Sequence, residues 1–204
     1  IQPAIDLAEN GFSLTIKEAQ KLNDYQVDFL SANDSISYFY NGGNWKTGDL
    51  LFLPELANTL CLIRDKGREG FYSGEVADNM LSEIQKSGGI MKQADLDKYQ
   101  SIWRDVVEGK YKDYTILSMP PPSSGGIALI QLLKGSEKYD FRAYSHNSPE
   151  NVHLMTELER RVYADRATYL GDPDFYNVPV DMLLDSSYLA ERFSDISLDN
   201  KTNS

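Results

Sequence analysis

The residues best suited to chemistry lie in one short stretch rich in proline, serine and glycine. It consists of Pro120, Pro121, Pro122, Ser123, Ser124, Gly125 and Gly126. The prolines fix φ and remove backbone donors, so they predict an extended lead-in to a helix. The glycines permit positive φ or the close approach of another segment, and N–H groups at a helix start can hold an anion. Because the Gly-Lys-Ser/Thr of a phosphate loop is missing, a structural helix entrance is favoured over a binding site.

Other nucleophiles and metal ligands are few. The two histidines, His146 and His153, are too few and wrongly spaced for a zinc site, so we expect them on the surface or at a helix cap. A Ser-His-Asp triad could be assembled from Ser123 or Ser124, but no Gly-x-Ser-x-Gly elbow accompanies them. The single cysteine, Cys61, has apolar neighbours and is predicted to be a core residue that forms no internal disulfide.

Charged residues are numerous, but their spacing singles out no catalytic pair. Glu157 and Arg161 stand four positions apart, which predicts a solvated helix face stabilised by about 0.2–0.5 kcal/mol. Asp and Glu number 31 against 20 Lys and Arg, which leaves a net charge of −11. This balance excludes nucleic-acid binding through overall charge and argues against docking on anionic lipid. No apolar stretch approaches the roughly 20 residues that span a bilayer.

Caps, prolines and glycines divide the rest of the chain into elements that could position these residues. Thr15 and Glu18 form a capping-box pair, while Ser73 and Ser148 are expected to cap later helices. The glycine at Gly135 is expected to end the helix that follows the Ser-Ser-Gly-Gly stretch. The expected helices cover residues 1–10, 15–30, 54–66, 74–87, 125–134 and 149–170.

A change to β-branched and aromatic residues predicts a β-hairpin from residues 102–111 and 114–119, with a turn at Lys112-Asp113. A short strand is also expected at residues 36–40. The fold class is therefore α+β, mainly helical with a β-hairpin. Residues 1–190 are expected to form a single domain, and residues 191–204 a polar, frayed tail.

Residues 118–126, Ser-Met-Pro-Pro-Pro-Ser-Ser-Gly-Gly, resemble a signature of the γ-glutamyltransferase (γ-glutamyltranspeptidase) family. Further segments resemble the same family in the same order along the chain. The resemblance covers about residues 1–190 and corresponds to the C-terminal part of the family's large subunit. The further segments are residues 2–12, 48–50 with 54 and 56–57, 71–77, 88–89, 95–96 with 99, and 163–166 with 169–175.

The resemblance implies a fold and a reaction. Such enzymes are made as a precursor that cuts itself into a large and a small subunit, and they resemble N-terminal nucleophile hydrolases with an αββα sandwich. A threonine at the start of the small subunit attacks a γ-glutamyl amide such as glutathione, with its own α-amino group as base. Water or an amino acid then accepts the γ-glutamyl group from the acyl-enzyme, and backbone donors stabilise the oxyanion.

The chain departs from the family pattern because the nucleophile motif, Thr-Thr followed by His-Tyr, is not found in it. Thr202 does not match that motif. No catalytic or substrate-binding residue is therefore carried over, and neither a metal nor a cofactor is implied. Among the motifs, only the stretch from Pro120 to Gly126 is placed near the family's site.

The expected partners follow from what is missing. They are the N-terminal part of the large subunit, the small subunit with its threonine, and small-molecule γ-glutamyl substrates of the full enzyme. A bacterial, periplasmic or secreted protein is expected, whose chain here is an inactive fragment that supplies scaffold. The alternatives are a related acylase, a capsule transpeptidase of the same scaffold, and a non-catalytic helical binding or structural module.

Overall fold

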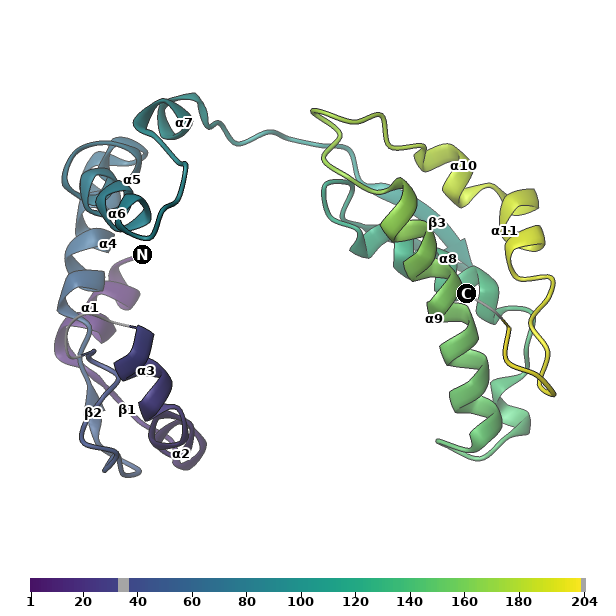
Figure 1. Ribbon diagram of the computed structural model, residues 1–204, viewed down its shortest axis with the longest axis horizontal. Coiled ribbons are helices and arrows are strands. Elements are labelled where there is room, and N and C mark those ends of the chain that lie inside the picture. Colours follow the sequence, from purple (N-terminus) through teal and green to yellow (C-terminus); the bar gives the residue numbers. More distant parts are fainter. Residues whose placement is uncertain (33–36, 203–204) are drawn as a thin grey trace. The chain divides into compact units, whose positions relative to one another are not determined.

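The computed structural model describes residues 1–32 and 37–202, and its contacts divide the chain into two compact units, Ile1–Ser101 and Ile102–Ser204 (Figure 1). The sequence predicts instead one domain over residues 1–190 and a frayed tail over 191–204. The tail differs from expectation because Phe193 is only 2% exposed and packs with Leu158, Val162 and Leu189. Part of the expected tail therefore belongs to the core of the second unit.

The first unit consists of helices and one very short pair of strands. Strand β1 (Phe12–Ser13) pairs antiparallel with β2 (Leu50–Leu51), with Phe12 opposite Leu51. Helix α1 packs against α4. The helices are α1 (Gln2–Asn10), α2 (Ile16–Asp24), α3 (Gln26–Ala32), α4 (Pro54–Lys66), α5 (Glu69–Tyr72), α6 (Gly74–Lys86) and α7 (Gln93–Lys98).

The capping box predicted at Thr15 is confirmed at the start of α2. The Glu18 N–H donates to the Thr15 hydroxyl at 3.3 Å, and the Thr15 N–H donates to Glu18 Oε2 at 2.7 Å. These bonds satisfy backbone donors that a helix start leaves without partners. The single run predicted through Leu30 is instead two helices, because the backbone leaves the helical region at Tyr25 (φ −94°, ψ 12°).

Three local expectations for the first unit differ from the structure. Ser73 precedes α6, but its hydroxyl donates to the Glu69 carbonyl in the preceding turn and caps nothing. Cys61 is half-buried rather than a core residue, and so are its neighbours Leu60, Leu62 and Ile63 on α4. No strand forms over residues 37–40, where the Tyr40 N–H closes a turn on the Ser37 carbonyl, and residue 36 lies outside the described residues.

The second unit begins with the predicted hairpin, which is confirmed over β3 (Val107–Tyr111) and β4 (Tyr114–Ser118). The strands are antiparallel, with Val107 opposite Ser118 at one end and Tyr111 opposite Tyr114 at the other. Lys112 in the predicted turn adopts φ 52°, as two-residue hairpin turns require. Residues 102–106, which were expected to extend the first strand, remain outside it.

The helices of the second unit pack on that hairpin and on one another. The helix predicted from Ser148 is confirmed as α9, with the Asn151 N–H donating to the Ser148 hydroxyl at 3.3 Å. The unit contains α8 (Gly125–Ser136), the 3-10 helix η1 (Phe141–Ala143), α9 (Pro149–Tyr169), α10 (Val180–Leu184) and α11 (Ser186–Arg192).

Helix α8 does not stop at Gly135 as predicted but continues to Ser136. Gly135 is buried against α9, and a Cβ at this position would lie 2.5 Å from Leu158 Cδ2. The glycine therefore allows two helices to approach closely and does not terminate one of them.

Helix α8 is the central element of the second unit. Its Ile127 and Ile130 form a core with Val107 of the hairpin and Leu183 of α10. The expected fold class, mainly helical with a β-hairpin, is confirmed, and the pair β1–β2 is an addition to it. Over residues 1–32 and 37–202, no helix is both long and apolar enough to cross a membrane.

Candidate functional site at the start of α8

The Pro-Ser-Gly stretch connects the end of β4 to the start of α8. The extended lead-in predicted from the prolines is wrong, because residues 120–123 form a turn in which the Ser123 N–H donates to the Pro120 carbonyl at 3.1 Å. Pro121 is buried while Pro122 is exposed, and the peptide bond between them is cis. The ring of Pro121 is therefore packed inside the unit, and the chain enters α8 directly after this loop.

Gly126 explains why this entrance needs a glycine. A Cβ at this position would lie 2.2 Å from the carbonyl oxygen of Met119, a distance that no real side chain tolerates. The same position on Gly125 meets nothing closer than the Ser123 hydroxyl at 3.5 Å. Of the two roles expected for the glycines, close approach of another segment therefore holds at Gly126.

The two serine hydroxyls make structural contacts. The Gly125 N–H donates to Ser123 Oγ at 3.3 Å. Ser124 is the N-cap residue of α8, but its side chain makes no capping bond and instead accepts from Arg166 Nε of α9 at 2.9 Å. His153 bonds through Nε2 to the Ser197 carbonyl at 2.7 Å. Within the part of the chain that the structure describes, no hydrogen bond joins a histidine to either serine, so no triad is assembled.

A buried row of charges on α9 lies on the side that faces the rest of the unit. Glu157 is 2% exposed and Arg161 is 6% exposed, with Asp165 one further turn along and also buried. Arg161 Nη1 donates to Glu157 Oε2 at 2.8 Å and to the Glu157 carbonyl at 2.9 Å. The prediction of a solvated face at Glu157 and Arg161 is therefore wrong.

Arg161 also holds the segment that follows α11. Its Nη2 donates to Asp195 Oδ1 at 2.6 Å and to the Thr202 hydroxyl at 2.9 Å. The Thr202 hydroxyl donates in turn to Glu157 Oε2. Within the segment expected to be a frayed tail, Asp195 and Thr202 therefore contact the buried pair Glu157 and Arg161.

Asp165 joins two other elements, α11 and α8, to α9. Arg192 Nε of α11 donates to Asp165 Oδ1 at 2.8 Å. Gln131 of α8, which is 1% exposed, donates through Nε2 to Asp165 Oδ2 at 3.4 Å and to the Leu183 carbonyl of α10 at 2.9 Å. Burial, together with a hydrogen bond to Asp165, raises the pKa of Tyr188 to about 12. We call the set Gln131, Glu157, Arg161, Asp165 and Arg192 the α9 charge ladder.

The hydrogen-bond partners of Glu157 keep its carboxylate ionised. Burial by itself would raise the pKa of Glu157, but hydrogen bonds from Arg161 and Thr202 outweigh it and lower the pKa to about 2. The hydrogen bond from Arg161 likewise lowers the pKa of Asp195. Glu157 and Asp195 are thus held as charged partners of Arg161.

The spacing of residues along α9, unlike the composition of the chain, is a sequence signal for this ladder. The buried positions of α9 alternate in steps of three and one, the pattern of a core-facing helix stripe. Glu157, Arg161 and Asp165 occupy that stripe beside leucine and valine. The buried positions are Leu154, Glu157, Leu158, Arg161, Val162 and Asp165.

The arrangement as a whole lacks the parts of a catalytic centre. No cluster of three or more His, Cys, Asp or Glu that could hold a metal ion occurs among residues 1–32 and 37–202. The hydroxyls of Ser123 and Ser124 contact a backbone N–H and a guanidinium, and neither partner is a base. The geometry fits a framework that orients α8, α9 and the segment after α11.

Similarity to known proteins covers the whole chain. All of residues 1–204 match the family model described as Gamma-glutamyltranspeptidase. The chain is 40% identical over 199 residues to the glutathione hydrolase proenzyme of Pseudomonas aeruginosa, which is 97% of this chain and 35% of that protein. It is 34% identical over 200 residues to the acylase ACY 1 proenzyme of Pseudomonas sp. strain V22, or 98% of this chain and 36% of that one.

Solved structures also match nearly all of this chain but only part of their own length. The crystal structure of Helicobacter pylori gamma-glutamyltranspeptidase superposes with a TM-score of 0.87 at 41% identity, covering 99% of this chain and 58% of that one. The transpeptidase CapD of Bacillus anthracis superposes with a TM-score of 0.74 at 30% identity, covering 93% of this chain and 63% of that one. The chain thus spans about a third of the length of the curated relatives it matches.

Proposed function

Because the chain belongs to the gamma-glutamyltranspeptidase family, we propose that it is a large-subunit portion of an enzyme that moves the γ-glutamyl group of glutathione or a related amide. Water or an amino acid accepts that group after it has formed an acyl-enzyme on a threonine outside this chain. The observation that carries the proposal is the 40% identity, over 97% of the chain, to a glutathione hydrolase proenzyme.

The proposed role of this chain is scaffold. Its fold matches part of two gamma-glutamyltranspeptidase structures, and these enzymes have the N-terminal nucleophile hydrolase fold. The contacts of the loop at Ser123 and Ser124 support a structural role, since both hydroxyls already have partners that are not bases. We accordingly place the nucleophile, its base and the substrate contacts in the parts of the proposed enzyme beyond these 204 residues.

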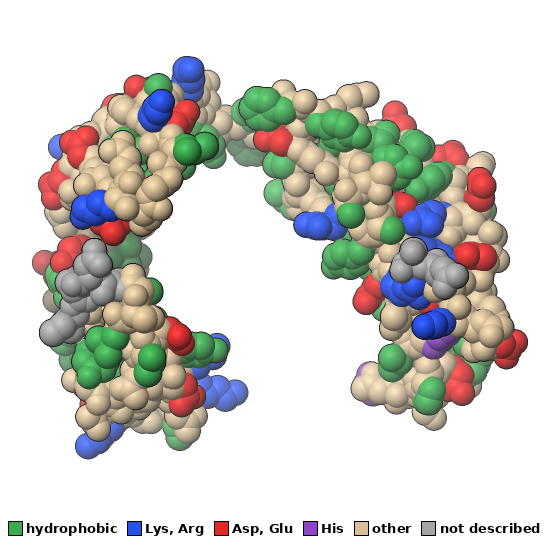
Figure 2. Space-filling view, in the orientation of Figure 1, with side chains coloured by type: hydrophobic (Ala, Val, Ile, Leu, Met, Phe, Trp, Pro, Cys, Tyr) green, Lys and Arg blue, Asp and Glu red, His purple; other side chains and the backbone are tan. Residues whose placement is uncertain are grey.

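Exposed apolar side chains support proposed partners that would cover them. Hydrophobic side chains are spread over the surface of both units (Figure 2). Trp103 is fully exposed, and Ile90 and Phe175 are about nine-tenths exposed. Aromatic side chains such as Trp103 and Phe175 are enriched where one chain packs against another. The partners we propose are the rest of the large subunit and the small subunit that carries the threonine.

The proposal is tested with γ-glutamyl-p-nitroanilide and two proteins. The isolated chain should release no p-nitroaniline, because it lacks the nucleophile. A chimera in which this chain replaces the matching segment of the Pseudomonas aeruginosa proenzyme should mature and turn over the anilide, with the unaltered proenzyme as control. Turnover by the isolated chain would refute the scaffold role, and a folded chimera that never matures would refute the proposed parent.

Two alternative parents share the scaffold, and a third hypothesis has no catalytic parent. Identity falls from 40% for the glutathione hydrolase to 34% for the acylase and 30% for CapD, which favours the first. The coding sequence that flanks this chain would separate these hypotheses. A threonine-led segment downstream supports a catalytic parent, whereas its absence supports a helical binding or structural module.

We further propose that the parent protein is exported to the periplasm or secreted, as the family resemblance implies. Fractionation of source cells with an antibody against this chain tests the location. Recovery in the periplasmic or culture fraction supports export, and recovery with cytoplasmic marker enzymes contradicts it.

A further inference from the structure

Two asparagines of the first unit are each followed directly by glycine, at Asn10-Gly11 and at Asn41-Gly42. An asparagine carries its side-chain amide within reach of the backbone nitrogen of the next residue. Because glycine has no Cβ, nothing on that residue hinders attack of its nitrogen on the amide carbon. The two pairs are identical in sequence, so a difference in their reactivity depends on the structure around them.

The pair Asn41-Gly42 begins an exposed turn. Both residues are exposed, and the Asn44 N–H closes the turn by donating to the Asn41 carbonyl at 3.1 Å. The two central residues, Gly42 and Gly43, have φ values of 61° and 70°. Within residues 1–32 and 37–202, neither the side-chain amide of Asn41 nor the N–H of Gly42 has a hydrogen-bond partner. No such bond has to break before these two groups meet.

The pair Asn10-Gly11 is held apart by its surroundings. Asn10 is the last residue of α1, and its Nδ2 donates to the Asp6 carbonyl, one turn back along the helix, at 2.9 Å. Side chains of a helix lean toward its N-terminus, so this amide points away from Gly11. Gly11 is also covered, because a Cβ at this position would lie 2.9 Å from Phe52 Cε1. Attack at Asn10 therefore requires the loss of a hydrogen bond and a rotation of the side chain.

We propose that Asn41 is a site of spontaneous deamidation in the folded chain. The Gly42 nitrogen, after losing its proton to hydroxide, forms a bond to Asn41 Cγ. The bond between Cγ and Nδ2 breaks, and the amide nitrogen takes up a proton and leaves as ammonia. Water then opens the succinimide ring at one of its two carbonyl–nitrogen bonds. Opening at Cγ gives aspartate, and opening at the main-chain carbonyl gives isoaspartate.

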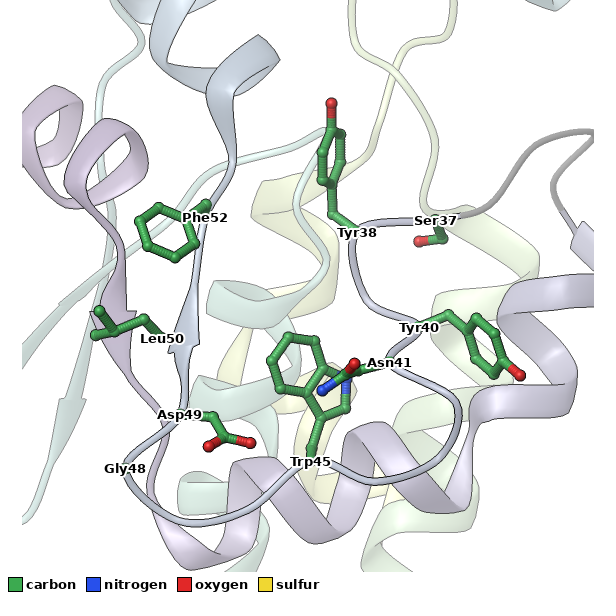
Figure 3. A pocket seen from close by; sticks show the side chains of 9 residues that line it. All are labelled: Ser37, Tyr38, Tyr40, Asn41, Trp45, Gly48, Asp49, Leu50 and Phe52. Carbon is green, nitrogen blue, oxygen red and sulfur yellow. The ribbon is translucent and has the colours of Figure 1, made fainter.

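The reaction changes a surface cavity of about 850 Å³ in the first unit (Figure 3). Asn41 belongs to its wall, on the loop between Tyr40 and Trp45. Among the described residues that line the cavity, Asp49 has the one carboxylate, and none is lysine, arginine or histidine. Deamidation adds a second negative charge to this wall, and isoaspartate also lengthens the main chain by a methylene group inside the turn that Asn44 closes. The proposal does not depend on the proposed transferase function.

Peptide mapping by mass spectrometry tests the proposal on the 204-residue chain. The folded chain is kept in mildly alkaline buffer, and deamidation is followed over days in the peptides that contain Asn10 and Asn41. Asn41 should react at least about tenfold faster. This factor corresponds to about 1.4 kcal/mol in the barrier, which is about the net contribution of the hydrogen bond that Asn10 has to break. An isoaspartyl methyltransferase should transfer labelled methyl groups to the Asn41 peptide of the aged chain.

Unfolding in urea separates the effect of the fold from that of the sequence. In urea the two Asn-Gly pairs should react at similar rates, because α1 and the hydrogen bond from Asn10 to Asp6 are lost. Asn41→Gln should abolish the fast reaction without changing thermal melting, since glutamine would have to form a larger ring. Asn10→Gln is the matched control and should leave the reaction at Asn41 unchanged. The proposal is overturned if Asn41 stays intact in the folded chain, if both asparagines react equally there, or if the preference for Asn41 persists in urea.

Discussion

Replacing Arg161 with methionine should destabilise the second unit by about 3–5 kcal/mol, the cost of leaving a buried charge without its partner. In the native structure Arg161 and Glu157 are 6% and 2% exposed, and the guanidinium contacts Glu157, Asp195 and Thr202. Methionine fills similar space but donates nothing. Glu157 would then keep only Arg160 at 2.8 Å and the Thr202 hydroxyl as partners.

The double variant Glu157→Leu/Arg161→Met sharpens this prediction. Removing both charges eliminates the uncompensated carboxylate, and apolar replacements of buried ion pairs are often neutral or stabilising by about 1–4 kcal/mol. The double variant should therefore be more stable than Arg161→Met alone. Arg160 and Asp195 lose their partner in that variant, but at 29% and 64% side-chain exposure both can be hydrated.

Hydrogen exchange followed by mass spectrometry is the appropriate assay, because the chain has two compact units whose unfolding need not be concerted. Peptides from α9 and α11 should exchange faster in Arg161→Met, while those from α4 in the first unit should be unchanged. Arg142→Met is the matched control, since Arg142 is 91% exposed and its pair with Asp140 lies at the surface. Its effect should stay within about 0.5 kcal/mol.

The reasoning fails if Arg161→Met costs less than about 1 kcal/mol, because removing one partner of a buried ion pair is expected to cost about 3–5 kcal/mol. It also fails if the double variant is no more stable than the single one. Either result would mean that Glu157 becomes hydrated or protonated at little cost once Arg161 is gone.

Two further predictions concern the loop and the pH dependence. Gly126→Ala should lower the melting temperature, because overpacking against the Met119 carbonyl costs about 1–3 kcal/mol. Gly125→Ala should melt close to wild type, because a Cβ there would make only an ordinary contact with the Ser123 hydroxyl at 3.5 Å. Equal melting of the two variants would contradict the close-approach argument. Because the pKa of Glu157 is lowered to about 2 from 4.5, its stabilising contribution is complete above about pH 4.5 and is lost as the pH falls toward 2. Urea unfolding between pH 6 and about 2.5 should show this loss, and a Glu157→Gln variant with an equally steep decline would rule Glu157 out as its cause.

Local features of the chain were predictable from sequence because their causes lie within a few residues. The capping box at Thr15, the Ser148 cap of α9 and the hairpin turn at Lys112 each depend on neighbours along the chain. The motif at residues 118–126 likewise indicates the family, and the family match over residues 1–204 confirms it. For the candidate site, the sequence therefore predicts the loop before α8 and its resemblance to the family signature.

The sequence by itself thus determined the family, the main helices and the hairpin, through short-range capping, turn chemistry and motif. Only the tertiary structure decided that the charged Glu157, Arg161 and Asp165 are buried on α9. It also decided that Gly126 meets a carbonyl, that Gly135 lies inside a helix contact, and that Thr202 is held by Arg161. The physical reason is distance along the chain. Arg161 and Thr202 are 41 residues apart, and whether a charged side chain at the core stripe finds its partners depends on elements that come together only when the unit folds.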